Sequence, residues 1–225
     1  SFRTTDAVLD PATVSDGGQS LDLVSGLQIR KPVASVSGFF VDAGGAVVTS
    51  AAAVQGCGRI TLDDIHGASV TAQDQALGVA MLRPDARLAP RGIAQFRADM
   101  PRLKSEIAVA GFPFGGVLSA PTLTFGSLED VTGLAGEAEM KRLALAASDG
   151  DAGGPVLDAG GAVLGMLLPR DTGGRQLPQE VAFAADAEAL LGFLNLAGLQ
   201  GSRTQGEGAM APEDLTERAT DMTVK

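Results

Sequence analysis

The sequence predicts an all-β fold, and three observations lead to that prediction. From Val33 onward, short apolar runs of strand length alternate with Gly, Asp and Pro, a pattern that favours strands joined by turns over helices. One turn motif occurs twice in nearly the same form. Before residue 200, only one segment carries a convincing helical pattern. Together these features suit a barrel or a sandwich.

The predicted strands begin after an irregular lead-in. Residues 1–25 are polar, and Pro11 and the turn signal at 16–18 interrupt any regular period. The strands that follow are short and apolar, and they lie at 38–41, 46–49, 58–62, 70–72, 79–82, 107–110, 123–125 and 142–145. Their number and spacing are typical of an all-β domain rather than of alternating strands and helices.

The repeated motif is a predicted hairpin turn. Residues 41–47 read Val-Asp-Ala-Gly-Gly-Ala-Val, and residues 157–163 read Leu-Asp-Ala-Gly-Gly-Ala-Val. Asp and paired glycines tolerate the positive φ angles that a tight connection between twisted strands needs. The two copies fit either an internal duplication, with one copy in each lobe, or the independent recurrence of the same turn chemistry.

The first predicted helix follows Asp186, which can cap its N-terminus, and Gly198 helps to end it. Its apolar stripe has the i, i+3, i+4, i+7 spacing of a helix face and consists of Ala187, Leu190, Leu191 and Leu194. This segment is therefore expected to pack against the strands.

The end of the chain predicts a linker and a second helix. Residues 200–208 are polar and rich in Gly, and Pro212 is well suited to the first turn of a helix. The one apolar face of this helix is formed by Leu215, Ala219 and Met222. Residues 223–225 resemble the beginning of a strand.

Charge and composition exclude several classes of partner. Lys+Arg 17 against Asp+Glu 27 gives a net charge of −10, so phosphate backbones and anionic lipid surfaces are repelled. Trp and Tyr are absent, which leaves little for base stacking. We expect no nucleic-acid partner. Because no apolar run reaches about 18 residues, we also expect no membrane span within these residues, and no signal peptide is recognised there.

The lone Cys57 and the lone His66 offer little chemistry. Cys57 is expected to be a buried thiol, and pairing with a cysteine outside this chain stays open. One His and one Cys cannot supply an ordinary zinc site. The acidic run from Asp149 lacks the later oxygen ligands of a calcium loop, and residues 206–211 imitate a dinucleotide fingerprint but follow a linker rather than a strand. No metal and no cofactor are expected.

Several ordered blocks resemble the trypsin-like serine proteases, in particular their bacterial branch. Residues 150–155 read Gly-Asp-Ala-Gly-Gly-Pro, like the Gly-Asp-Ser-Gly-Gly-Pro loop that carries the nucleophile in that family. Residues 49–54 lie where the family has its histidine block, and residues 78–82 where it has its aspartate strand. Further matching blocks lie at 38–42, 111–116 and 181–184. The resemblance covers roughly residues 35 to 195.

The resemblance implies a fold and its boundaries. It implies two six-stranded antiparallel β-barrels with a C-terminal helix, in a domain of residues 26–199. The expected lobes are residues 26–100 and 101–199. The linker and short helix of residues 200–225 follow this domain.

The resemblance also implies that the catalytic triad is missing. Ala52, Gly78 and Ala152 stand where the family has His, Asp and Ser, and none of them can act as base, orienting acid or nucleophile. His66 is expected at a hairpin tip, away from the cleft, and so is not a relocated base. The chain resembles a pseudoprotease.

A binding shape is expected to survive this loss. In the resembled fold Gly150, Asp151 and Ala152 form a vestigial oxyanion hole, in which backbone N–H groups can hold a carbonyl oxygen. Ala146 stands at the position of the specificity-pocket floor, so a surviving pocket suits a small or apolar side chain. A collapsed or filled groove is the open alternative.

Three functional hypotheses follow. The first is a catalytically inactive domain that binds a protein or peptide, or acts as a scaffold, in a larger multidomain bacterial protein; the resemblance implies a periplasmic or secreted location. The second is a serine hydrolase with a rebuilt site that uses Ser148 or Ser50 with Lys141. The third is a purely structural domain whose cleft is closed.

Overall fold

The computed structural model describes residues 32–115, 117–170, 178–206 and 208–225. Every helix and strand described below belongs to one compact unit, Ala34–Lys225. The predicted lead-in, residues 1–25, lies outside the described residues.

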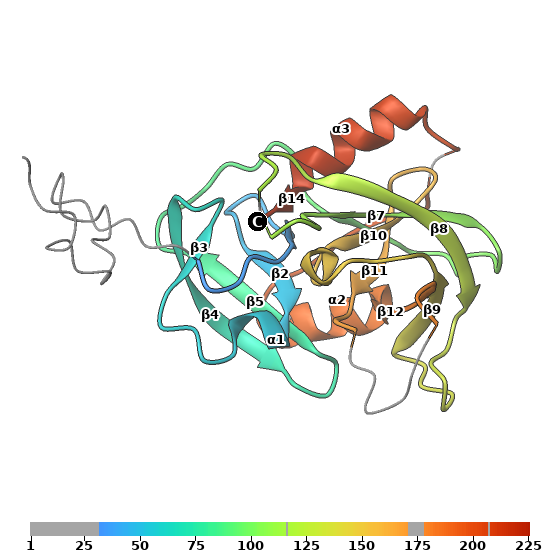
Figure 1. The fold of residues 1–225 in the computed structure, drawn as a ribbon, viewed down its shortest axis with the longest axis horizontal. Coiled ribbons are helices and arrows are strands. Elements are labelled where there is room, and N and C mark those ends of the chain that lie inside the picture. Colours follow the sequence, from blue (N-terminus) through green and yellow to red (C-terminus); the bar gives the residue numbers. More distant parts are fainter. Residues whose placement is uncertain (1–31, 116, 171–177, 207) are drawn as a thin grey trace, which may run out of the picture. The chain divides into compact units, whose positions relative to one another are not determined.

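The first sheet has six antiparallel strands in the order β14-β1-β2-β5-β4-β3 (Figure 1). Their bounds are β1 Gly38–Phe40, β2 Val47–Ser50, β3 Ile60–Leu62, β4 His66–Asp74, β5 Val79–Pro84 and β14 Thr223–Val224. The two edges of this sheet meet at the chain end, where the Asp63 N–H donates to the Lys225 carbonyl at 2.8 Å. The last residues of the chain therefore belong to the first sheet.

The second sheet contains a closed six-stranded barrel, formed by β7 to β12 and closed by the pairing of β10 with β11. The bounds are β7 Glu106–Gly111, β8 Thr122–Asp130, β9 Met140–Ala144, β10 Pro155–Asp158, β11 Val163–Leu167 and β12 Val181–Asp186. These strands pair antiparallel throughout. The all-β, trypsin-like two-barrel fold expected from the sequence is confirmed.

Two short strands extend this barrel beyond the expected six. Strands β6 (Gln95–Arg97) and β13 (Ser202–Thr204) join the sheet through parallel pairings of β6 with β11 and with β13. They were not predicted because three-residue strands rich in polar side chains give no apolar run. As a result, the second sheet includes residues on both sides of the predicted lobe, 101–199.

The helices match the sequence patterns that predicted them. Helix α2 (Ala187–Leu196) begins at the cap Asp186, whose side chain accepts from the Glu188 N–H, and helix α3 (Pro212–Met222) buries its predicted apolar face. A four-residue helix, α1 (Ala51–Val54), and a 3-10 turn, η3 (Asp149–Asp151), complete the described set. None of the described helices is long and apolar enough to cross a membrane.

The repeated motif forms the same turn in both sheets. Asp42 Oδ1 accepts from the N–H groups two and four residues later, at 2.9 and 2.8 Å, in the connection between β1 and β2. Asp158 Oδ1 accepts from the two equivalent N–H groups, both at 2.9 Å, between β10 and β11. The predicted turn chemistry is confirmed at both positions.

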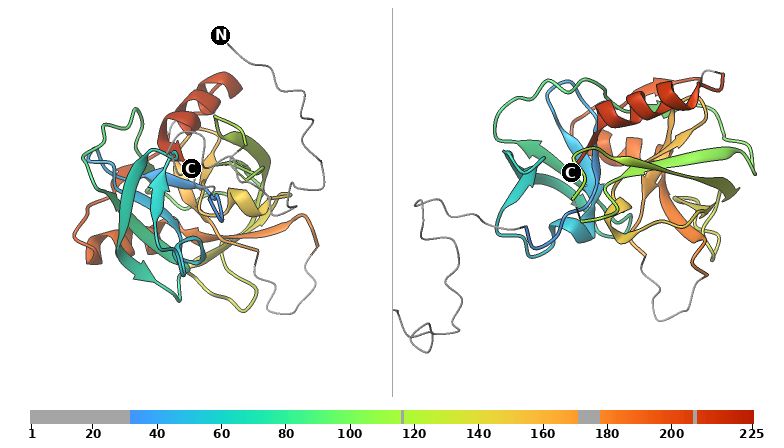
Figure 2. Two further views of the ribbon diagram at one scale, coloured as in Figure 1. Left: turned by 60° about the vertical axis from the view of Figure 1, so that its left-hand side comes forward. Right: turned by 45° about the horizontal axis from the view of Figure 1, so that its top comes forward.

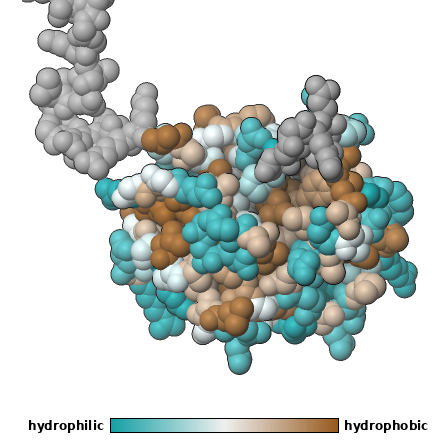
Figure 3. Space-filling view, turned by 90° about the horizontal axis from the view of Figure 1, so that it is seen from below, coloured by the Kyte–Doolittle hydropathy of each residue, from teal (hydrophilic) through white to brown (hydrophobic). Residues whose placement is uncertain are grey.

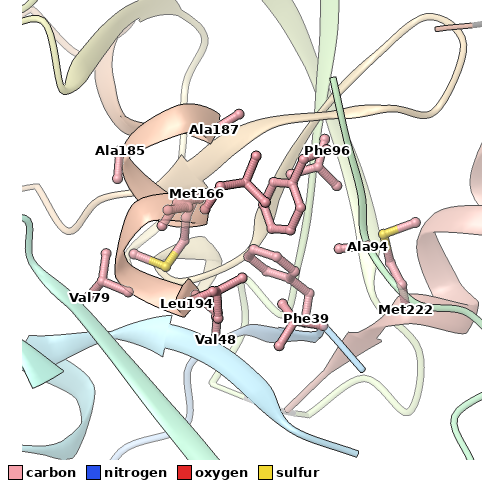
Figure 4. Packing of buried hydrophobic residues seen from close by; sticks show 14 of the residues in the cluster. Phe39, Val48, Val79, Ala94, Phe96, Met166, Ala185, Ala187, Leu194 and Met222 are labelled. Atoms are coloured by element: carbon pink, nitrogen blue, oxygen red, sulfur yellow. The ribbon is translucent and has the colours of Figure 1, made fainter. Parts of the chain in front are cut away.

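The largest hydrophobic core cluster contains residues from both sheets and from α2 and α3. Phe39 of β1 and Phe96 of β6 lie side by side in this cluster, with ring centroids 6.4 Å apart. Figure 4 shows these two rings with Val48, Met166, Leu194 and Met222 nearby. Because one core joins both sheets, the lobes are packed as one body.

The expectation of a buried thiol at Cys57 is wrong. Cys57 is exposed, and its Sγ donates to the Ala53 carbonyl at 3.4 Å. It follows Gly56 in the turn after α1, within the run of exposed residues 55–59. His66 is exposed beside the β3–β4 turn, as expected.

Candidate functional site

The loop of residues 149–154 connects β9 to β10 and passes close to the first sheet. Gly153 has φ +87°, and a Cβ there would clash with the Ser37 carbonyl and lie 2.6 Å from Thr49 Oγ1. Any side chain at this position is therefore excluded both by backbone conformation and by space. The loop therefore requires glycine at position 153.

Ser37 clamps this loop from the first sheet. Its Oγ donates to the Gly150 carbonyl at 2.7 Å and accepts from the Phe112 N–H at 2.9 Å. Its N–H donates to the Ala152 carbonyl at 3.2 Å, and its own carbonyl accepts from Thr49 Oγ1 at 2.7 Å. Ser37 is 1% exposed. One serine thus orients two peptide groups of the loop.

The clamped loop is closed on itself. The Ala152 N–H donates to the Asp149 carbonyl at 3.3 Å, and the Asp151 N–H donates to the Ser148 carbonyl at 3.0 Å. An oxyanion hole needs donors that point at an incoming oxygen. In this arrangement the Ala152 N–H is already used inside the 3-10 turn.

Asp151 is a buried carboxyl with one oxygen lacking a partner. Its Oδ2 accepts from the Ser148 N–H at 2.9 Å, while Oδ1 has no hydrogen-bond partner among the described residues. Burial raises the pKa of the Asp151 carboxyl above its ordinary value, and the Ser148 N–H only partly opposes this shift. An unpaired buried oxygen makes the closed loop energetically costly.

The three positions predicted to replace the triad lie on neighbouring segments. The Ala51 N–H, next to Ala52, donates to the Gly78 carbonyl at 2.8 Å, so α1 begins beside Gly78. A Cβ on Gly78 would lie 3.1 Å from Leu168 Cδ2, and Leu168 lines the same cavity as Ala152. Ala52 itself is exposed, whereas Ala152 is 5% exposed.

A small apolar cavity adjoins Ala152. It measures about 20 Å³, room for about one water molecule. The described residues that line it are Ala147, Ser148, Ala152, Leu167, Leu168, Pro169, Arg170, Gln179, Val181, Ala182 and Phe183. Ala146, the predicted pocket floor, is exposed and does not line this cavity; its neighbour Ala147 does.

The ion-pair partner of Lys141 is an aspartate and not one of the candidate serines. Lys141 is buried on β9 and forms an ion pair with Asp186, the cap of α2. Burial lowers the pKa of Lys141, and the charge of Glu188 opposes this shift. Ser50 Oγ accepts from the Ala53 N–H as the cap of α1, at 3.3 Å. Ser148 is exposed at the cavity rim.

The described residues contain no group of three or more His, Cys, Asp and Glu side chains that could hold a metal ion. The cavity beside Ala152 is lined mainly by small or apolar side chains. The residue that sequence reasoning missed is Ser37. The available signal was a small polar residue immediately before the buried run Gly38–Phe40, but the loop that it binds lies 113 residues away.

A double barrel whose glycine-rich loop faces the start of a short helix defines the class of the trypsin-like proteases and their relatives. The family described as "Trypsin-like peptidase domain" matches residues 36–166, more than half of the chain. The chain belongs to this family.

Solved structures of proteases share the fold. The inactive form of the Rv3671c protease from M. tuberculosis, in a serine-to-alanine mutant, aligns with TM-score 0.60 and 26% identity over 75% of this chain and 84% of that chain. The active form of the same protease aligns with TM-score 0.58 and 23% identity, over 77% and 78%. A serine endoprotease from Yersinia pestis aligns with TM-score 0.60 and 17% identity, over 72% and 57%.

One relative extends well beyond the residues it shares with this chain. The chain is 30% identical over 204 residues to the uncharacterized protein y4bJ of Sinorhizobium fredii. The match covers 84% of this chain and 31% of that protein, so the chain spans about a third of its relative's length.

Proposed function

We propose that residues 34–225 form a catalytically inactive trypsin-like domain that binds a protein or peptide segment, or serves as a scaffold, in a larger bacterial protein. Ala52, Gly78 and Ala152, at the positions where the resembled proteases carry His, Asp and Ser, are the observation that carries the proposal. The match to only part of a longer relative supports the multidomain context. A periplasmic or secreted location is part of the proposal and rests on the family alone.

The chemistry of the three positions supports inactivity. A serine hydroxyl is a poor nucleophile until an imidazole takes its proton, and the imidazole needs a carboxylate to hold it in place. Methyl groups and hydrogen supply none of these functions. In a well-studied protease, removal of the triad lowers turnover by about 10⁶-fold, which leaves too little activity for efficient peptide hydrolysis.

An exposed apolar surface beside the loop supports a binding role. The segment after β7 carries three apolar side chains, Phe114, Val117 and Leu118, that are 64%, 84% and 38% exposed. The same segment contacts the candidate site, because a Cβ on Gly150 would clash with the Phe112 carbonyl. Residues 111–121 contain no charged side chain. The chemistry of this surface suits an extended peptide with small or apolar side chains.

The closed-cleft alternative has its own support. The cavity beside Ala152 measures only about 20 Å³, and the Ala152 N–H is engaged inside the loop. On the face drawn in Figure 3, hydrophobic residues form separate groups among hydrophilic ones rather than one continuous binding surface. These observations favour a purely structural domain as the second candidate function.

Casein hydrolysis tests the loss of catalysis. We expect no cleavage by the wild type and none by Ala152→Ser, because a restored hydroxyl still lacks a base and an orienting acid. An active trypsin measured in parallel is the positive control. Cleavage by either form would show that the site retains a working base, and the proposal would fail.

A peptide titration followed by NMR separates binding from a purely structural role. An acetylated, amidated peptide of Ala and Val residues is expected to shift the amide signals of Ser148 and Ala152. Ala147→Trp fills the cavity and should abolish these shifts, whereas Ala86→Trp, an exposed position after β5, should leave them unchanged. Absence of shifts even at a large excess of peptide would favour a purely structural domain.

A further inference from the structure

The last strand of the chain pairs with the strand that follows the clamp. In the register of β1 with β14, Gly38 faces Val224 and Phe39 faces Thr223. Gly38 directly follows Ser37, which holds the carbonyls of Gly150 and Ala152. Strand β14 is therefore docked one residue away from the side chain that closes the candidate site.

Helix α3 leads from the β10–β11 turn of the second sheet to β14 in the first sheet. Arg218 Nη1 donates to the Gly160 carbonyl in the β10–β11 turn at 3.0 Å, and the Gly92 N–H donates to the Asp221 carbonyl at 3.1 Å. Figure 2 shows α3 running along the molecule to the chain end marked C, beside β1. We call residues 212–224 the α3–β14 strap.

Burial fixes the position of the strap. The inner face of α3, formed by Leu215, Ala219 and Met222, belongs to the main core cluster. Val224 is 1% exposed and packs in a second cluster with Phe40 and Val47 of the first sheet. The strap thus connects the second barrel's turn to β1, the strand beside the clamp.

The closed conformation of residues 149–152 carries an energetic cost that other contacts must offset. It buries Asp151 Oδ1 without a partner and uses the Ala152 N–H in a turn. Opening of the loop would bring the carboxyl to water and release the N–H, so the closed form persists only while other contacts offset that cost. The hydrogen bonds of Ser37 are among those contacts.

We propose that the α3–β14 strap is a latch: while β14 is docked on β1, Ser37 keeps residues 149–152 closed, and undocking of β14 opens the loop so that the N–H groups of Gly150 and Ala152 can bind a peptide carbonyl. Only the last step, carbonyl binding, rests on the proposed function. The coupling between strap and loop stands independently of it.

Hydrogen exchange of single amides tests the coupling. Val224→Asp places a charge at a buried position and should undock β14. The amides of Phe112, Asp151 and Ala152, which are bonded in the closed loop, should then exchange at least tenfold faster. Thr220→Asp, on the exposed face of α3, is the matched control and should change none of them. Circular dichroism checks that both variants are folded.

Exchange in the wild type at low urea gives the second measurement, which decides the question even if Val224→Asp fails to fold. The latch predicts that the amide of Val224 opens together with those of Asp151 and Ala152, at lower urea than the rest of the barrel. The latch would be overturned if the loop amides exchange only with global unfolding, or if their exchange rates do not change when β14 is undocked.

The peptide titration keeps the two proposals distinguishable. In Val224→Asp the same Ala and Val peptide is expected to bind at least tenfold more tightly than in the wild type. Coupled exchange without any peptide binding would preserve the latch and remove the binding function. Peptide binding with uncoupled exchange would preserve the binding function and remove the latch.

Discussion

The two sides of the candidate site differ in how firmly their backbone is held. On the side of residues 149–154, Gly153 has no room for a side chain and Ser37 binds two carbonyls of the loop. On the opposite side, Ala52 is an exposed residue of a four-residue helix. The difference teaches that close packing and the hydrogen bonds of Ser37 confine the glycine loop, whereas the side chain of Ala52 is not confined in this way.

The largest effect is expected for Gly153→Ala. The new Cβ would meet the Ser37 carbonyl at a φ of +87°, so we expect a loss of about 3 kcal/mol or more in the free energy of unfolding. Urea denaturation measures it. Gly56→Ala is the matched control, since Gly56 has φ +69° but open space around it, and should cost only about 1 kcal/mol. Equal costs would mean that the close approach is unimportant.

Removal of the clamp should have the next largest effect. Ser37→Ala leaves the buried Phe112 N–H and the Gly150 carbonyl without their partner, at a cost of about 2 kcal/mol. Ser50→Ala, which removes the cap of α1 on the opposite side, should cost about 1 kcal/mol or less. Urea midpoints of both variants test the order. A larger loss at Ser50 would reverse the comparison.

The buried carboxyl of the loop predicts a pH dependence. Because the pKa of Asp151 is raised in the folded state, its contribution to stability is fully present below the ordinary pKa of 3.8 and is lost as the pH rises through the raised pKa. Asp151→Asn should therefore be more stable than the wild type at neutral pH by about 1 kcal/mol, and the gain should vanish near pH 3.

Unfolding measured at both pH values checks this prediction. The exposed neighbour Asp149, changed to Asn, is the control and should show no such gain. A gain for Asp151→Asn that is the same at both pH values would contradict a titrating carboxyl in the loop.

The smallest effect is expected on the open side of the site. Ala52→His introduces the family's imidazole at an exposed position and should change the free energy of unfolding by less than about 0.5 kcal/mol. It should also leave casein uncleaved, because Ala152 and Gly78 remain. A large loss of stability would show that α1 is held as tightly as the loop.

The fold was predictable because its main signals are local. The Asp-Ala-Gly-Gly turns, the stripe of α2 and the apolar face of α3 all depend on neighbouring residues, and each is present in the structure. The glycine loop was recognised because its sequence is distinctive. The assignment of Ala52, Gly78 and Ala152 to the triad positions remains a prediction.

The features that escaped prediction depend on contacts between distant residues. The pairing of β14 with β1 joins the two ends of the domain, and the bond from Ser37 to Gly150 spans 113 residues. Strands β6 and β13 are too short and polar to form a recognisable pattern. The lining of the cavity comes from separate segments between residues 147 and 183, which only the folded chain brings together.

The most direct test of an intact frame without catalytic chemistry is labelling by a fluorophosphonate, which reacts covalently with activated serine nucleophiles. Mass spectrometry of the wild type after incubation is expected to show the unmodified mass, while an active trypsin in the same buffer is labelled. A single adduct on Ser148, Ser50 or any other serine would contradict the account, because it would show that a nucleophile and its base survive in the site.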